Sequence, residues 1–242
     1  MITLYKKELS VFFSTIIGPL IIGLFLLINS LVLWSNISQF NILDNAYASI
    51  DSFFTIAPLL FLLFIPAISM RTFSEEYNIG TIESLITKPI TTNQIIASKF
   101  LAILTLVTAS IVPTFLYVIT IYFLGETPGN LDLAGIIGSY IGLLMLSSIF
   151  VSIGVFASSI SNNQVISFIL GIIISVIFYF GFDLLSKIQI LESIAVTLQK
   201  IGISYHYNII SKGLLLVSDI IYFLSISFLF LKLSEIVILS KK

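Results

Sequence analysis

Long apolar stretches alternate with short polar connections along the chain. A helix that crosses a bilayer needs about 20 mostly apolar residues, because the hydrocarbon core is about 30 Å thick and each residue advances the helix by about 1.5 Å. Six stretches meet this requirement, at about residues 13–34, 53–70, 100–124, 134–158, 165–182 and 217–231. The pattern therefore predicts an all-α polytopic membrane protein with six transmembrane helices in a single domain, residues 1–242.

Three of the polar segments predict helices of their own. Residues 1–12 set apolar side chains against Lys6, Lys7 and Glu8, which is typical of a short amphipathic helix on the inner membrane surface. A plain flank of the first transmembrane helix is the alternative. Residues 71–94 connect the second and third transmembrane helices. Residues 183–213 are mildly amphipathic and predict short outer helices before the last transmembrane helix.

Composition supports the membrane assignment and narrows the chemistry. Of 242 residues, 58% are hydrophobic and only 10% are charged, whereas globular domains are about a quarter charged. Because so few charged residues cannot form the solvated surface of a soluble domain of this size, we expect the chain to lie in a lipid bilayer. A net charge of −1 gives no indication of nucleic acid binding. With no cysteine and one histidine, we expect no metal site and no cofactor bound by this chain.

The positive charges predict the orientation. An even number of transmembrane helices puts both termini on one side, and lysine and arginine favour the cytoplasmic side. The side shared by the termini carries Lys6, Lys7, Arg71, Lys88, Lys99, Lys232, Lys241 and Lys242. The opposite side carries Lys187, Lys200 and Lys212. Both termini and residues 71–94 are therefore expected in the cytoplasm.

No motif in the chain predicts an enzyme. The phosphate-binding pattern G-x-x-x-x-G-K-[ST] and the zinc pattern H-E-x-x-H are both missing from the sequence. Ser204 and His206 are the nearest approach to a hydrolase pair, but two helical residues apart they point about 200° away from each other. Asp219 is expected at the outer headgroup boundary rather than at mid-depth, where a proton relay would need it. We therefore predict no catalytic residue and expect energy to come from a partner.

The segment 71–94 has the features of two short helical turns. Phe73 and Tyr77 are four residues apart, and Gly80 separates them from a second apolar group. Thr72 with Glu75 fits a helix-capping box at the start of the segment.

The side chains of this segment suit contact with another protein. Its acidic residues are Glu75, Glu76 and Glu83, and Phe73, Tyr77 and Leu85 are candidate apolar anchors for a partner's groove. A solvated linker is the alternative.

The same segment resembles a known family. The run RTFSEEYNIGTIESLITKP, residues 71–89, resembles the signature R-x-F-x-E-E-x-x-x-G-T-x-E-x-L-x-x-x-P of type-2 ABC transporter permeases. The opening KKEL and the run YHYN at residues 205–208 extend the likeness over nearly the whole chain, although many relatives carry Phe where Tyr207 stands. Within the family the likeness is greatest to gliding-motility-associated permeases. Permeases of copper-assembly systems come next.

The resemblance implies a function and a set of site residues. It implies a permease subunit, of the export type, in a bacterial inner membrane, paired with a second copy or with another permease or auxiliary subunit. A separate cytoplasmic ABC ATPase would hold ATP and Mg²⁺. The residues that match the coupling helix of the family, with Arg71 as the anchor at the membrane boundary, are Arg71, Glu75, Glu76, Gly80, Thr81, Glu83, Leu85 and Pro89. A membrane scaffold for a surface machine is the alternative function.

Small residues and prolines mark places where helices approach or bend. Two stripes of small residues allow close helix packing in lipid, either between subunits or within the chain. The fourth transmembrane helix carries Gly138 and Gly142, and the fifth carries Ser167, Gly171 and Ser175. Bends are expected at Pro58, Pro66 and Pro113.

The predicted orientation can be tested with reporter fusions. Alkaline phosphatase fused after Lys242 should be inactive, because the enzyme folds only outside the cytoplasm, whereas a fusion after Leu214 should be active. Phosphatase activity at Lys242 with none at Leu214 would reverse the orientation.

Overall fold

The computed structural model describes residues 1–35, 39–44, 49–86, 90–125 and 131–241. In these ranges the chain is helical nearly throughout and contains no strand, which confirms the all-α prediction. Six helical segments are long and apolar enough to span a bilayer, which confirms the predicted number. Their bounds are Ile17–Trp34, Asp51–Ile79, Thr92–Leu124, Leu133–Ile160, Gln164–Ser186 and Val217–Ser240.

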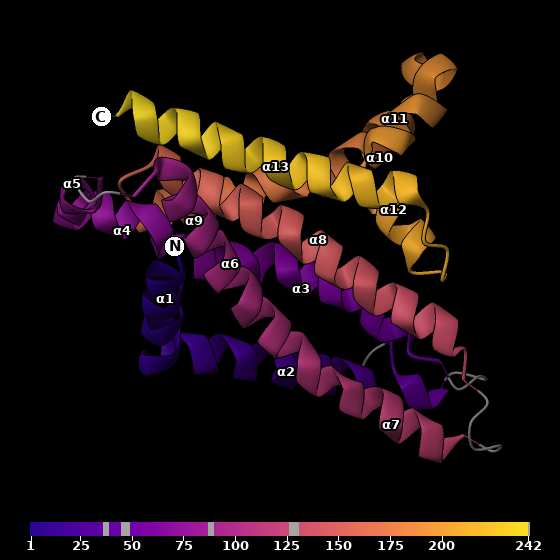
Figure 1. Ribbon diagram of the computed structural model, residues 1–242. Coiled ribbons are helices and arrows are strands. Elements are labelled where there is room, and N and C mark those ends of the chain that lie inside the picture. The colour runs from indigo at the N-terminus through magenta and orange to yellow at the C-terminus, as the bar shows by residue number, and fades with distance from the viewer. Residues whose placement is uncertain (36–38, 45–48, 87–89, 126–130, 242) are drawn as a thin grey trace.

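Helices α1 to α7 make up the chain from the N-terminus through the third span (Figure 1). Helix α1 turns sharply into α2, so the predicted N-terminal helix exists as a separate element. Helix α3 is followed directly by α4 and α5, and the third span is α6 and α7 joined by a 3₁₀ turn, η2. The bounds are Ile2–Ser14 (α1), Ile17–Trp34 (α2), Asp51–Ser69 (α3), Arg71–Ile79 (α4), Thr81–Ile86 (α5), Thr92–Ile111 (α6), Val112–Thr114 (η2) and Phe115–Leu124 (α7), with a 3₁₀ turn at Ile42–Asp44 (η1).

The second half contains the central helix and the short helices. Helix α8 is the most buried span and packs against α3, α6, α9 and α13. Short helices precede the last span, at the end of the bundle opposite α4 and α5 (Figure 1). The bounds are Leu133–Ile160 (α8), Gln164–Val176 (α9), Ile177–Gly181 (η3, a π-helical turn), Phe182–Ser186 (α10), Gln189–Ile194 (η4, 3₁₀), Ala195–Ile201 (α11), Ile203–Ile210 (α12) and Val217–Ser240 (α13).

The small residues singled out in the sequence pack within this chain. A Cβ at Gly138 would lie 3.2 Å from the carbonyl oxygen of Ile210, and one at Gly142 would lie 2.8 Å from the side chain of the same residue. A Cβ at Gly171 would lie 3.1 Å from the Cβ of Pro66 on α3. Its neighbours one turn away on α9, Ser167 and Ser175, are also buried. Both stripes therefore bring α8 and α9 close to helices of their own subunit.

The prolines differ in what they do to the helices. Pro58 and Pro66 lie inside α3, which stays one α-helix from Asp51 to Ser69. Pro113 lies in η2, where the α-helical hydrogen-bond pattern of the third span is interrupted. Beyond this turn, Tyr117 of α7 forms a hydroxyl–hydroxyl hydrogen bond of 2.8 Å with Ser30 of α2. The break at Pro113 thus separates α6, which packs on α1, α2, α8 and α13, from α7, which is hydrogen-bonded to α2.

Gly154 gives a direct test of the packing between α3 and α8. A Cβ at this position would lie 2.0 Å from Ser69 Oγ. Replacing Gly154 with Leu should therefore cost about 1–3 kcal/mol and lower the melting temperature of the purified protein by about 2–12 °C. Gly23→Leu is the matched control, because no heavy atom lies within 4 Å of its Cβ position. Equal melting temperatures for the two variants would contradict the close approach.

Candidate functional site

The polar segment that begins at Arg71 continues the second transmembrane helix. Met70 has α-helical backbone angles, so α3 passes into α4 without an irregular residue. Thr72 consequently lies inside the helix, and its hydroxyl donates to the carbonyl oxygen of Ser69 at 2.6 Å. The predicted capping box of Thr72 and Glu75 is therefore wrong, because a capping residue must lie outside the helix that it begins. The segment does contain a capping box, formed by Thr91 and Gln94 at the start of α6.

Helix α4 is fixed to the central helix by one serine. The hydroxyl oxygen of Ser158 on α8 accepts hydrogen bonds from the backbone N–H groups of Phe73 (2.9 Å) and Ser74 (3.1 Å). The same hydroxyl donates to the carbonyl oxygen of Met70 at 2.9 Å. The Phe73 ring is completely buried in the chain's own core. The prediction that Phe73 is an anchor for a partner's groove is therefore wrong.

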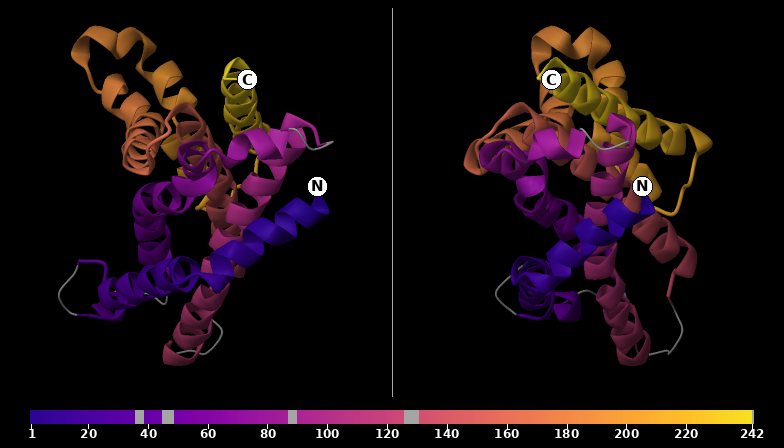
Figure 2. Two further views of the ribbon diagram at one scale, coloured as in Figure 1. Left: turned by 90° about the vertical axis from the view of Figure 1, so that its left-hand side faces the viewer. Right: turned by 60° about the vertical axis from the view of Figure 1, so that its left-hand side comes forward.

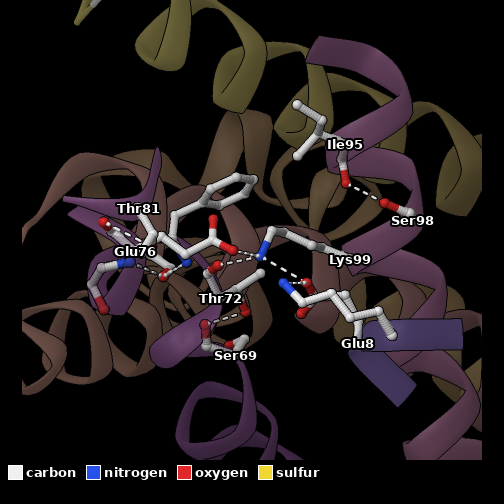
Figure 3. A network of polar contacts seen from close by, with 12 residues as sticks. Glu8, Ser69, Thr72, Glu76, Thr81, Ile95, Ser98 and Lys99 are labelled. Carbon is white, nitrogen blue, oxygen red and sulfur yellow. Dashed lines mark hydrogen bonds and ion pairs between the residues drawn. The ribbon is translucent and has the colours of Figure 1, made fainter. Parts of the chain in front are cut away.

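A buried lysine joins α4 to two other helices. Lys99 lies on α6 with only 2% of its side chain exposed. Its ammonium group donates to Glu76 Oε1 at 2.8 Å, to the carbonyl oxygen of Thr72 at 2.8 Å and to Glu8 Oε1 at 3.4 Å (Figure 3). It also lies 5.1 Å from the centre of the Phe73 ring. We call Lys99, Glu8 and Glu76 the inner ion cluster; it connects α1, α4 and α6.

The buried ammonium group of Lys99 requires opposite charge and hydrogen bonds around it. Removing a charge from water costs several kcal/mol unless opposite charges and hydrogen bonds replace the lost solvent. Two carboxylates and one carbonyl oxygen do this for Lys99. Glu76 Oε2, in contrast, is buried and has no hydrogen-bond partner within the described residues. The cluster therefore holds the Glu76 carboxylate inside the chain, while Glu8 is also paired with Lys7 at 3.7 Å.

The remaining residues of the proposed coupling set lie nearer the surface. Gly80 has φ +77°, a left-handed conformation that favours glycine, and it separates α4 from α5. Gly80, Thr81 and Glu83 are exposed, and Glu75 and Arg71 are half-buried. The backbone of Leu85 lies in α5, but its side chain and the whole of Pro89 are outside the described residues. The structure thus divides the set into an inward Glu76 and an outward tip.

A second lysine ties α4 to the end of α8. The ammonium group of Lys241 donates to the carbonyl oxygens of Ser159 (2.9 Å) and Ile160 (2.8 Å), where α8 ends. It lies 4.3 Å from the centre of the Tyr77 ring on α4. Partial burial lowers the pKa of Lys241 from its usual value. A cation at the carbonyl end of a helix is favourable, because the unpaired carbonyl groups carry partial negative charge.

Sequence reasoning missed the residues that position α4. Lys99 was counted as a cytoplasmic charge, yet it is buried, and Glu8 was read only as part of an amphipathic surface. A signal was available for Lys99, because a single lysine at the start of a long apolar run requires a partner. For Ser158 and Lys241 the sequence gives no comparable signal, since their partners are backbone atoms of distant residues.

The polar residues at the opposite end form a separate cluster. Asp219 is 2% exposed, and its Oδ1 lies 2.7 Å from His206 Nδ1. His206 Nε2 donates to the carbonyl oxygen of Lys200 at 2.7 Å, so neither ring nitrogen is left for Ser204. Asp219 lies in the first turn of α13 with its side chain packed inward against α12, and its depth at the outer headgroup boundary stays a prediction. Within the described residues no group of three or more potential metal-binding side chains comes together.

Comparison with protein families gives a match over nearly the whole chain. The family model described as ABC-2 family transporter protein matches residues 9–238. The match includes α4, α5 and Lys99, and it begins one residue after Glu8. Comparison with curated proteins gives no match.

The inner ion cluster predicts a large effect of removing its cation. Lys99→Met leaves the carboxylates of Glu8 and Glu76 without their cation, so we expect a loss of about 3–5 kcal/mol, or about 6–20 °C in melting temperature. Adding Glu76→Gln to Lys99→Met should restore part of the loss. Lys232→Met is the control, because Lys232 is 45% exposed and pairs with Glu235 on the same helix. A melting temperature unchanged by Lys99→Met would show that the cluster does not hold these helices together.

Proposed function

The chain belongs to the ABC-2 family of transporter proteins and is thus a membrane permease, and we propose that a separate cytoplasmic ATPase drives it through α4 and α5. The observation that carries this proposal is the division of α4–α5 into an anchored base and an exposed tip. At the base, Lys99 and Ser158 connect α4 to α6 and α8. At the tip, Gly80 and Glu83 are exposed, so the rest of the described chain does not cover them.

The tip has the surface that a protein partner requires. Ile79 is 66% exposed at the end of α4, where it is the apolar residue nearest to Gly80. Asn78, Thr81 and Glu83 surround it with groups that can form hydrogen bonds and ion pairs. An apolar centre with a polar rim is typical of protein interfaces. These features support contact between the tip and a cytoplasmic subunit.

The anchored base supports transmission of movement into the membrane. A force on the tip would displace α4, and the ion pair with Lys99 would carry the displacement to α6. Glu8 would carry it to α1, and the hydrogen bonds of Ser158 would carry it to α8. Packed helices move as rigid bodies rather than deforming continuously. ATP and Mg²⁺ would be held by the partner ATPase, which supplies the energy.

We also propose the finer assignment to an export system of the gliding-motility-associated kind in a bacterial inner membrane. The run at residues 71–89 and the opening KKEL support this assignment. The excess of lysine and arginine at the end that carries α4 supports cytoplasmic termini. Pairing with a second copy, or with another permease or auxiliary subunit, would complete the transport pathway.

The proposal is tested by altering the tip while leaving the inner ion cluster intact. Gly80→Pro with Glu83→Lys removes the left-handed residue and reverses an exposed charge. The tagged chain is purified from its own membranes, and vanadate-sensitive ATP hydrolysis is measured in the eluate. We expect co-purified ATPase activity to fall at least about tenfold, which corresponds to a loss of about 1.4 kcal/mol in binding.

The control variant makes the same Glu→Lys charge reversal at the opposite end of the helical bundle. Glu192→Lys reverses an exposed carboxylate in η4, far from α4 along the bundle, and should leave the co-purified activity unchanged. Membrane insertion of all variants is checked by their yield in the membrane fraction. Full ATPase co-purification with the doubly altered tip would refute the proposed contact.

A further inference from the structure

Two adjoining cavities lie at the end of the bundle opposite α4 and α5. The first has a volume of about 490 Å³ and is enclosed by α3, α8, η3 and α12. The second has a volume of about 370 Å³ and lies between η3, α10, α11 and α12. Tyr179, Asn208 and Lys212 line both cavities, so these three side chains form the wall between them. Figure 2 shows the orange segment that contains α10 and α11 projecting from the bundle at this end, whereas α12 packs against α8.

Tyr179 is the unusual residue of this wall. It lies in η3, the π-helical turn that interrupts the fifth span. It is 7% exposed, and its hydroxyl has no hydrogen bond within the described residues. The hydroxyl of its neighbour Tyr207, in contrast, donates to the carbonyl oxygen of Phe54 at 2.7 Å. Single π-helical turns occur frequently at functional sites. The Tyr179 hydroxyl is not enclosed by the described chain, and its side chain lines both cavities, so it is open to a hydrogen-bond partner from outside. The space beside Tyr179 is therefore the place where a partner from outside the chain would lie.

The charges of the first cavity are also unpaired. Asp51, at the start of α3, and Lys212, beyond the end of α12, both line it and have no side-chain partner within the described residues. Asp132 lines it too, and its Oδ1 accepts the backbone N–H of Gly135 at 3.0 Å. Opposite charges that share a cavity without forming an ion pair are free to bind a ligand that carries both signs. This pattern excludes a simple structural ion pair as the role of Asp51 and Lys212.

The wall of the cavity is held in place before any ligand binds. Tyr207 fixes α12 to α3 through the bond to Phe54, and His206 fixes α12 to Asp219 of α13. The hydroxyl of Ser139 on α8 donates to the carbonyl oxygen of Ser211 at 2.8 Å. Helix α12 is thus attached to three neighbouring spans. A preorganised site loses less entropy on binding than one that must be ordered first.

We propose that the first cavity binds a small zwitterionic group, with its ammonium beside Asp51 and Asp132 and its anionic part beside Lys212. The Tyr179 hydroxyl and the Asn208 amide supply hydrogen bonds between the two ends. Two sources carry this chemistry: the phosphoethanolamine headgroup of a lipid, and the amino and carboxylate groups of an amino acid or short peptide. The proposal names a ligand class for the permease, and it rests on the proposed function only in placing the cavity outside the cytoplasm.

Binding is measured by protection of a single cysteine. The natural chain has no cysteine, so Thr55→Cys, in the exposed mouth of the first cavity, introduces a unique label site. The full-length protein in detergent reacts with a maleimide alone, with phosphoethanolamine, with dialanine, or with short-chain phosphatidylethanolamine. We expect at least one zwitterion to slow labelling fivefold or more, while ethanolamine and inorganic phosphate, each with one charge sign, do not. Leu43→Cys, exposed outside both cavities, should react at the same rate throughout.

Substitutions then connect the protection to the proposed groups. Asp51→Asn and Lys212→Gln should each raise the half-protecting concentration at least tenfold. Tyr179→Phe keeps the ring and should raise it about threefold, while Lys200→Gln, outside both cavities, and Tyr122→Phe, exposed on α7, should have no effect.

The outcomes separate the two sources and the two proposals. Protection by the lipid and not by dialanine assigns the site to a lipid headgroup, and the reverse assigns it to a peptide. No protection by any zwitterion, or protection unchanged by both charge substitutions, overturns the proposal. Because the isolated permease is used without an ATPase, failure here leaves the α4–α5 contact untouched, and failure of that contact leaves this result valid.

Discussion

The arrangement of the end of the bundle that carries α4 depends on the need of one buried ammonium group for opposite charge. Lys99 lies too deep to be solvated, so it draws Glu8 and Glu76 to one point. These carboxylates belong to elements that have little reason to meet otherwise, since α1 is amphipathic and α4 is largely polar. In water such a triad would contribute little, but removal of its cation from this setting leaves the Glu76 carboxylate without its ion-pair partner. The position of α4 relative to α1 and α6 follows from this requirement.

The six spans could be predicted from the sequence because a bilayer demands long apolar helices, and that demand is visible residue by residue. The continuation of α3 into α4 could not, since backbone hydrogen bonds through Met70 and Arg71 are indifferent to the polarity of the side chains. The inward direction of the Glu76 side chain could not be predicted from the sequence for another reason. Its partner Lys99 is 23 residues away and Glu8 is 91 residues from Lys99, whereas periodicity reports only neighbours within a few turns.

The two ends of the molecule use polar groups in different ways. At the end that carries α4, Lys99 and Lys241 are bonded to groups of the chain itself and leave an exposed tip beyond Gly80. At the other end, Asp51 and Lys212 are unpaired and face a cavity. The small residues Gly138 and Gly142, which suggested contacts between subunits as well as within one, instead admit α12 against α8 and so shape that cavity.

The 3₁₀ turn at Pro113 gives the third span a mechanical asymmetry. Helix α6 carries Lys99, whereas α7 is bonded through Tyr117 to Ser30 of α2. Because the regular backbone bonding is interrupted between them, α6 and α7 need not move as one rigid helix. A displacement of α6 would therefore reach α7 through a joint of three residues, so that the two ends of the third span could shift by different amounts.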